Sequence, residues 1–131
     1  MILRMYPVGE GFKMDRVLIL DDDEDRHVAF RKKYPTAELT HVYTSKEAIK
    51  KLENESFDWV FLDHDLGGQM MVKSGDDTGY EVANWMSEHI DRLPTKGILL
   101  HSLNPVGRKN MMNVLRRVDI DVYDRPGYWH G

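Results

Sequence analysis

The chain has 131 residues, no cysteine and a formal net charge of −4. This length is typical of one domain with a sizeable core, and the lack of cysteine excludes disulfides, thiolate metal sites and cysteine nucleophiles. The acidic balance argues against an extended nucleic-acid surface. With no apolar run long enough to cross a membrane and no signal-like stretch at the N-terminus, we expect a cytoplasmic protein without a membrane partner.

Residues 1–13 show no regular pattern, because Pro7, Gly9 and Gly11 interrupt them. We treat them as an N-terminal extension to a single domain that spans residues 14–131. Three alternatives stay open for the extension: an added strand, a flexible tail, or a true start at Met14.

From Asp15 onward, short apolar runs alternate with helical patterns. Continuous apolar runs are typical of strands that are covered on both faces. The expected strands are Val17–Leu20, Leu39–Tyr43, Asp58–Leu62, Ile98–Leu100 and Asp119–Tyr123. The expected helices are Asp25–Tyr34, one that follows the capping box Thr44–Glu47, Tyr80–Ile90 and roughly Lys109–Arg117.

The segment Gly67–Gly79 contains four glycines and has no clear periodicity. We expect a long loop there, and long loops within compact domains often cover binding sites.

Alternation of strands and helices predicts an α/β fold with a parallel sheet and right-handed crossovers. Five strands favour the flavodoxin-like order 2-1-3-4-5, with helices on both faces of the sheet. In this order the carboxyl ends of the first and third strands flank the topological switch point, where such folds bind ligands.

Polar clusters follow three of the predicted strands: residues 21–23, 63–65 and 101–104. Parallel strands would bring all three clusters to one edge of the sheet. Two like charges at ~4 Å cost on the order of 4 kcal/mol at an effective dielectric of ~20, so the five carboxylates need a divalent cation or protons. The pattern predicts a metal-assisted phosphate site.

Carboxylate oxygens suit Mg²⁺ or Mn²⁺, which we expect as the cofactor. We expect Asp22 to bind the ion directly, Asp21 to contact it directly or through water, and Asp63 to share it. Asp23 is better suited to cap the following helix. The alternatives are that the first cluster only caps a helix and that Asp63 only accepts hydrogen bonds from loop amides.

His64 and His101 are the two imidazoles within these clusters. Neighbouring carboxylates favour their protonated forms. One could protonate a leaving oxygen while the other accepts a proton from water, which makes both candidate catalytic residues beside Asp63. The alternative is a structural role for each ring.

Candidate phosphate ligands follow the fourth strand. Ser102 and Asn104 could donate hydrogen bonds to phosphate oxygens, or could only satisfy loop amides. Arg108, near the start of the fourth helix, offers a guanidinium fork that matches phosphate oxygens, unless it is merely a solvated charge.

Several of these positions resemble the receiver domains of two-component response regulators. Asp21 and Asp22 match the acidic pair of that family, and Asp63 matches its phospho-acceptor. The resemblance implies that the backbone carbonyl of Asp65 is a further metal ligand. It also implies that Arg125 stands where receivers have a lysine that contacts the phosphoryl group.

Two motifs depart from ordinary receivers. Leu62–Gly67 and His101–Gly107 resemble motifs of the predicted cyclic-phosphate-processing receiver-like family, an offshoot of receiver domains. The chain also ends soon after the fifth strand, so we expect the usual fifth helix to be missing.

The first functional hypothesis is a metal-dependent phosphoesterase that opens a cyclic phosphate, either an RNA 2′,3′-cyclic end or a small cyclic nucleotide. The second is a stand-alone receiver that signals through phosphorylation of Asp63. The third is a non-catalytic module that binds a nucleotide or docks on a partner.

Overall fold

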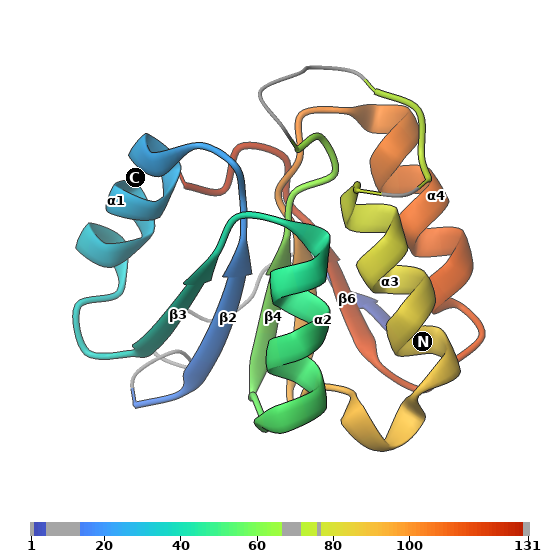
Figure 1. Cartoon of the computed structure of the whole chain (residues 1–131), viewed down its shortest axis with the longest axis horizontal. Helices are drawn as coiled ribbons and strands as arrows, with labels where there is room; N and C mark the ends of the chain where they lie inside the picture. The colour runs from blue at the N-terminus through green and yellow to red at the C-terminus, as the bar shows by residue number, and fades with distance from the viewer. Residues whose placement is uncertain (1, 5–13, 67–71, 76, 130–131) are drawn as a thin grey trace.

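Six parallel strands form a single sheet in the order β1-β6-β5-β4-β2-β3 (Figure 1). The computed structural model describes residues 2–4, 14–66, 72–75 and 77–129. The strands are β1 (Ile2–Arg4), β2 (Arg16–Leu20), β3 (Glu38–Val42), β4 (Trp59–Leu62), β5 (Gly97–Leu100) and β6 (Asp121–Asp124). The helices are α1 (Glu24–Lys33), α2 (Ser45–Asn54), α3 (Gly79–Glu88), the 3₁₀ helix η2 (Ile90–Arg92) and α4 (Pro105–Leu115).

The five predicted strands are present as β2 to β6 and lie in the predicted order 2-1-3-4-5, which confirms the flavodoxin-like fold. Residues 2–4 of the predicted extension add β1, which pairs in parallel with β6 at one edge. Of the three alternatives for the extension, an added strand therefore holds for these residues. Residues 1 and 5–13 lie outside the described part of the chain.

Side-chain caps fix where the helices begin. Asp23 Oδ1 accepts a hydrogen bond from Asp25 N at the start of α1, and Thr44 Oγ1 accepts one from Glu47 N at the start of α2. Both caps were predicted from the sequence, and each satisfies a backbone donor that the helix itself leaves unpaired.

The fourth helix begins earlier than predicted, at Pro105 instead of Lys109. Asn104 Oδ1 accepts a hydrogen bond from Gly107 N at 3.0 Å and so caps the helix. Pro105 occupies the first helical position, where proline is tolerated because that amide needs no intrahelical partner.

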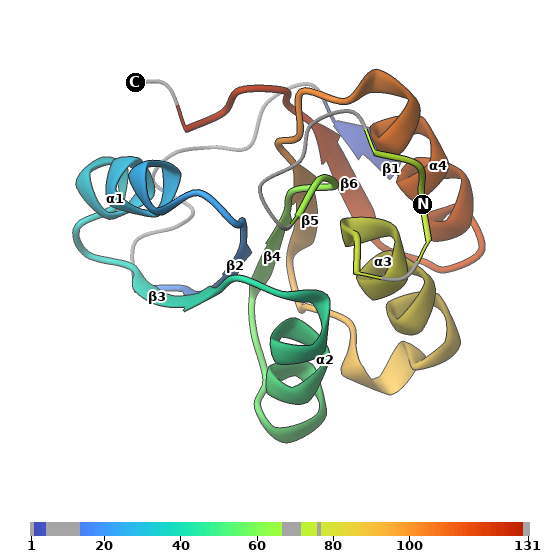
Figure 2. The same ribbon diagram turned by 45° about the horizontal axis from the view of Figure 1, so that its top comes forward.

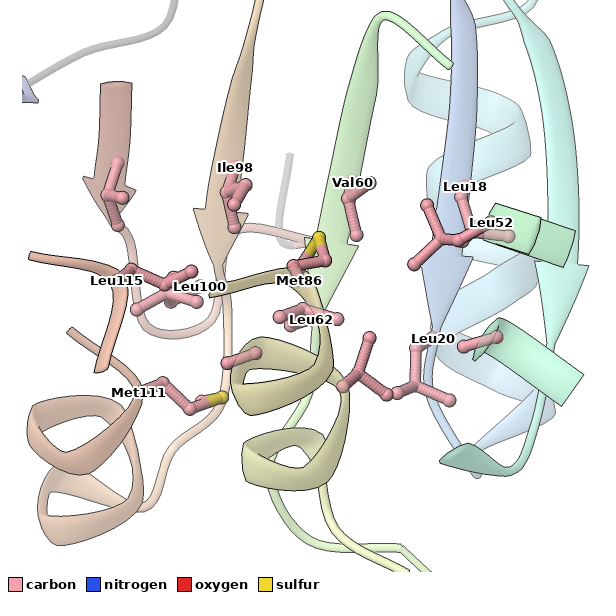
Figure 3. Close-up of a cluster of buried hydrophobic side chains, with 14 of the residues drawn as sticks. Leu18, Leu20, Leu52, Val60, Leu62, Met86, Ile98, Leu100, Met111 and Leu115 are labelled. Carbon is pink, nitrogen blue, oxygen red and sulfur yellow. The ribbon is translucent and has the colours of Figure 1, made fainter. Parts of the chain in front are cut away.

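Alternate residues of the strands enter two separate cores. Leu18 and Leu20 of β2 pack with α2, α3 and α4 on one face of the sheet (Figure 3). Val17 and Ile19 pack on the other face, against Phe30 of α1. Full burial of one such side chain stabilises the fold by about 1.5–3 kcal/mol. Both faces of β2 are thus covered, as its continuous apolar run predicts.

The α1 face has no second helix among the described residues, in agreement with the predicted loss of the fifth helix. The segment that follows β6 packs beside α1 instead (Figure 2). Tyr128 Oη and Tyr34 Oη are 2.6 Å apart, and Trp129 is buried in the core of this face. The segment up to Trp129 is thereby held against α1.

The predicted loop Gly67–Gly79 is only partly described, since residues 67–71 and 76 lie outside the described set. Residues 72–75, 77 and 78 form neither helix nor strand. None of the helices in the described part of the chain is long and apolar enough to span a bilayer.

Candidate metal and phosphate site

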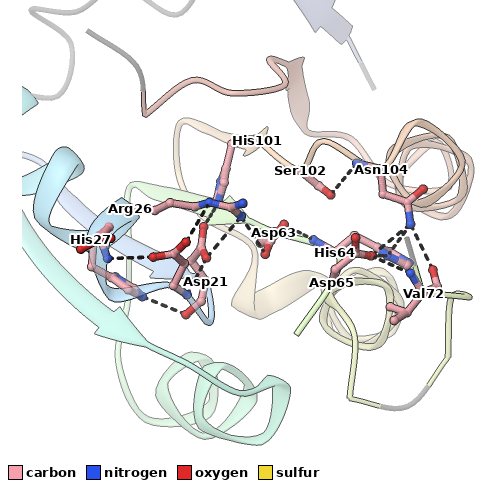
Figure 4. Close-up of polar contacts among 12 residues, drawn as sticks. Asp21, Arg26, His27, Asp63, His64, Asp65, Val72, His101, Ser102 and Asn104 are labelled. Atoms are coloured by element: carbon pink, nitrogen blue, oxygen red, sulfur yellow. Dashed lines mark hydrogen bonds and ion pairs between the residues drawn. The ribbon is translucent and has the colours of Figure 1, made fainter. Parts of the chain in front are cut away.

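Three residues at the carboxyl edge of the sheet form a buried group. Asp21, Asp63 and His101 each follow the last residue of a strand, and β2, β4 and β5 pair so that Leu20, Leu62 and Leu100 lie side by side. One ligand atom from each of the three residues lies within 4.8 Å of the other two. All three point to the α1 face of the sheet (Figure 4).

His101 and Asp21 are directly hydrogen-bonded. His101 Nε2 lies 2.9 Å from Asp21 Oδ2, and Asp21 Oδ1 accepts a hydrogen bond from Asp23 N. Burial lowers the pKa of His101 although Asp21 opposes this shift. Burial pushes the pKa of Asp21 upward, but the hydrogen bond from His101 and the other contacts outweigh it, so that its pKa is lowered. A neutral imidazole that donates from Nε2 to an ionised Asp21 satisfies both shifts.

One carboxylate oxygen of Asp63 lacks a hydrogen bond. Its Oδ1 accepts a hydrogen bond from His64 N at 2.9 Å, whereas its Oδ2 is buried and has no hydrogen-bond partner among the described residues. Burial, together with the negative charges of Asp21 and Asp22, raises the pKa of Asp63 from 3.8 to about 8, although Arg26 acts in the opposite direction. The predicted repulsion between carboxylates is therefore present.

Arg26 of α1 reaches into the same group, which the sequence analysis did not foresee. Its Nη1 lies 3.6 Å from both Asp21 Oδ1 and Asp63 Oδ2, and its Nε lies 3.7 Å from Asp23 Oδ2. The guanidinium also stacks over the ring of Trp129 at 4.2 Å. The sequence could have indicated this role, because Arg26 lies in the first turn of the predicted helix that starts at this edge of the sheet.

His64 belongs to a different network on the opposite face of the sheet (Figure 4). Its Nδ1 lies 2.8 Å from Asp65 Oδ1, and its Nε2 lies 2.7 Å from Ser74 Oγ. Asn104 Nδ2 donates to the same Asp65 oxygen. Successive strand residues point to opposite faces, so His64 follows Leu62 toward α3 and α4 while Asp63 follows Phe61 toward α1.

The side chains of Asp22 and Asp65 do not belong to the buried group, while the metal ligand expected at Asp65, its backbone carbonyl, stays a prediction. The side chain of Asp65 is engaged with His64 and Asn104. Asp22 is half-buried, and its charge contributes to the raised pKa of Asp63. The charge of Asp22 thus acts on the site, but the ligand atoms that lie close together belong to Asp21, Asp63 and His101.

The predicted phosphate ligands largely hold the loop and helix in place. Ser102 Oγ accepts a hydrogen bond from Asn104 N. Arg108 donates from Nε to Asp124 Oδ1 and from Nη1 to the carbonyl of Ser102, both at 2.8 Å. Arg125 follows β6 and donates its backbone N–H to the carbonyl of Leu100, which places it at the same edge of the sheet.

The donor set of the buried group fits a divalent cation. A buried carboxylate oxygen that lacks a hydrogen bond, on Asp63, faces a second carboxylate and an imidazole. The carboxylate oxygens of Asp21 and Asp63 suit Mg²⁺ or Mn²⁺ as ligands. Asp21 and Asp63 are the residues that would bind such an ion, and His101 would orient Asp21 through its hydrogen bond.

Metal binding is expected to strengthen with pH. Because the pKa of Asp63 is raised to about 8, the metal-free site carries a proton there at neutral pH, and an ion must displace it. The affinity for Mn²⁺ should rise by about tenfold per pH unit below this pKa and level off above it. Calorimetry in buffers of different ionisation enthalpy counts the released proton, and a pH-independent affinity between pH 6 and pH 8 would contradict this.

Substitution of the two histidines should have different consequences. His64→Ala removes a buried ring that packs on Gly107 and bonds to Asp65, and is expected to cost about 2–4 kcal/mol of stability. His101→Ala is expected to weaken Mn²⁺ binding at least tenfold. Chemical unfolding and calorimetry measure the two effects, and loss of Mn²⁺ binding in a folded His64→Ala protein would reverse the assignment.

Comparisons with known proteins bear on the family and the fold of the chain. The family model described as the cyclic-phosphate processing receiver domain matches residues 16–117. A search of curated proteins finds no match to the chain.

Similar solved structures include the response regulator TrrA from Thermotoga maritima in complex with Mg²⁺-BeF, at 21% identity and TM-score 0.61 over 85% of this chain and 87% of that one. A CheY-like receiver domain from Methanospirillum hungatei is 18% identical, with TM-score 0.60 over 86% of this chain and 82% of that one. A two-component response regulator from Clostridium difficile is 19% identical, with TM-score 0.61 over 85% and 82% of the two chains. At these identities the likeness shows the receiver fold.

Proposed function

Because the chain belongs to the family of cyclic-phosphate processing receiver domains, we propose that it is a metal-dependent phosphoesterase that opens a cyclic phosphate. The observation that carries this proposal is the buried imidazole of His101, bonded to Asp21 within the same group as Asp63. Phosphorylation of an aspartate needs carboxylates and a cation, whereas an imidazole adds a group that can transfer protons near neutral pH.

The bound cation would polarise a phosphoryl oxygen and orient the attacking water. Asp21 and Asp63 would supply its carboxylate ligands. The hydrogen bond from Nε2 to Asp21 leaves Nδ1 as the basic atom of a neutral His101, and Nδ1 has no hydrogen-bond partner among the described residues. His101 is therefore equipped to take a proton from water.

In the proposed reaction, the water oxygen bonds to phosphorus and one ring P–O bond breaks. The leaving alkoxide takes up a proton, so that a phosphate monoester and a free hydroxyl result. We propose an RNA 2′,3′-cyclic end or a small cyclic nucleotide as the substrate class. Arg125, which lies at the same sheet edge, is the proposed partner for a phosphate oxygen, because a guanidinium matches two such oxygens.

A panel of cyclic phosphates, assayed with Mn²⁺ or Mg²⁺ and again with a chelator, tests the proposal. We expect turnover of at least one substrate, lost with the chelator and reduced by about 10²–10⁴-fold in His101→Ala. His89→Ala is the matched control, since His89 is exposed and its ring contacts Trp85 one turn earlier in the chain. Chelator-insensitive turnover, or full activity in His101→Ala, would refute the mechanism.

Signalling by phosphorylation of Asp63 is the second candidate. It is favoured by the position of Asp63 directly after β4 and by the Oδ2 atom without a hydrogen bond. Incubation with acetyl phosphate and Mg²⁺ followed by mass spectrometry separates the two functions. A stable phosphoryl adduct on Asp63 without hydrolysis of cyclic phosphates would favour signalling, and nucleotide binding that survives chelation would favour a non-catalytic module.

A further inference from the structure

Arg26 supplies the positive charge that the acidic group would otherwise lack. Its Nη1 is 3.6 Å from one oxygen of Asp21 and 3.6 Å from Oδ2 of Asp63. Its side chain is 20% exposed, so water screens these charges only in part. The charge of Arg26 contributes to the lowered pKa of Asp21 and opposes the rise in the pKa of Asp63.

The contacts of Arg26 with Asp21 and Asp63 are ion pairs too long to be hydrogen bonds. Asp63 Oδ2 accordingly has no hydrogen-bond partner among the described residues although Nη1 faces it. The guanidinium therefore balances the charge of the two carboxylates without a hydrogen bond to either one. Contacts of this kind stabilise the metal-free site and can be broken when an ion binds.

A divalent cation and the guanidinium would compete for the same place. Metal–oxygen bonds are about 2.0–2.2 Å long, so an ion bound to Asp21 and Asp63 would draw close to the two oxygens that Nη1 faces at 3.6 Å. Two cations at such a separation repel each other strongly. Binding of the ion thus requires Arg26 to turn away.

Trp129 limits how far Arg26 can move. The guanidinium lies over the indole ring at 4.2 Å, and the same ring contacts His101 edge-on. A cation that stacks on an aromatic face gains about 0.5–2 kcal/mol. After displacement, the guanidinium of Arg26 can therefore remain stacked on this ring, close to the ion. Its N–H groups can then donate hydrogen bonds to an anion that the ion binds.

We propose that Arg26 is the resident counter-ion of the acidic group, that a divalent cation must displace it, and that the displaced guanidinium then binds a phosphate oxygen of the ligand. The inference rests on the metal site of the proposed function but not on turnover. Arg26 would then have opposite effects on the binding of the cation and of phosphate. It would weaken binding of the divalent cation to the metal-free site, and it would strengthen binding of phosphate once the cation is bound.

The test measures Mn²⁺ binding by calorimetry and by tryptophan fluorescence, and then inorganic phosphate binding at saturating Mn²⁺. Arg26→Gln is expected to bind Mn²⁺ at least tenfold more tightly than the wild-type protein and to bind phosphate at least tenfold more weakly. Arg26→Lys keeps the charge and should retain weak Mn²⁺ binding. The matched control is Arg31→Gln, which removes a more exposed arginine of the same helix that pairs with Glu24 and should change neither affinity.

Unchanged or weaker Mn²⁺ binding in a folded Arg26→Gln protein overturns the proposal, as does a wild-type protein that binds no divalent ion. If Arg26→Gln fails to fold, Trp129→Leu provides the second test: without the stacking partner, phosphate affinity at saturating Mn²⁺ must fall, and an unchanged affinity counts against the proposal. Tighter Mn²⁺ binding in Arg26→Gln together with no hydrolysis of any cyclic phosphate would refute the proposed enzyme and leave the counter-ion role intact.

Discussion

Asp63→Asn is expected to reduce the affinity of the protein for Mn²⁺ by at least about 100-fold, because it removes a charged ligand from the buried group while keeping its shape. The asparagine can still accept the hydrogen bond that His64 N donates to Oδ1. Metal-dependent turnover should be lost with the metal. Calorimetry and the cyclic-phosphate assay measure the two losses. The control is Asp25→Asn, which removes one negative charge from an exposed residue of α1 and should change neither metal binding nor turnover.

The same substitution is expected to leave the metal-free protein equally or more stable. In the folded protein the pKa of Asp63 is raised from 3.8 to about 8. The unfolded chain releases this proton at lower pH than the folded one, so the free energy of unfolding of the wild type falls as pH rises across that window. Asp63→Asn removes this contribution to the pH dependence. A large loss of metal-free stability at pH 8 would show that Asp63 is a structural residue.

Gly79→Ala is expected to destabilise the protein by about 3 kcal/mol or more, at the upper end of what overpacking costs. A Cβ atom at Gly79 would lie 1.8 Å from the backbone carbonyl oxygen of Asp63 and 2.8 Å from its carbonyl carbon. Backbone atoms cannot turn aside, so the start of α3 and the end of β4 must separate. The hydrogen bond from Gly79 N to the carbonyl of His64 would be strained as well.

Thermal unfolding should show a midpoint lowered by roughly 10 °C, and Mn²⁺ affinity should fall because Asp63 is displaced. Gly75→Ala is the matched control, since a Cβ there meets no atom within 4 Å among the described residues. A Gly79→Ala protein with wild-type stability would show that the close approach of α3 to β4 is not needed for the fold.

The strand order and the edge that carries the site followed from the sequence alone. Continuous apolar runs mark buried parallel strands, and a parallel sheet brings their carboxyl ends to one edge whatever the details of packing. The three polar clusters that follow these strands were predicted to meet at that edge, and one residue of each, namely Asp21, Asp63 and His101, does so. The helix caps at Asp23 and Thr44 are local hydrogen bonds and could be predicted for the same reason.

It was harder to predict toward which face of the sheet each of these side chains points. The answer depends on whether the alternation of side chains along a strand continues past its last residue. His64 and His101 were treated alike, yet the ring of His64 turns toward Ser74 while that of His101 turns toward Asp21. Strict alternation from Leu62 and Leu100 would have separated them, but loops after strands often break the alternation. The actual directions depend on the hydrogen bonds that each ring finds.

The order of apolar and polar residues by itself determined the parallel sheet, its strand order and the gathering of carboxylates and imidazole at one edge. Only the tertiary structure decided how those charges are balanced. Arg26 and Trp129 lie 103 positions apart in the numbering, and their contact exists because the segment after β6 packs against α1. Periodicity is a local property of a chain, whereas the partner of a buried charge is chosen by packing between distant segments.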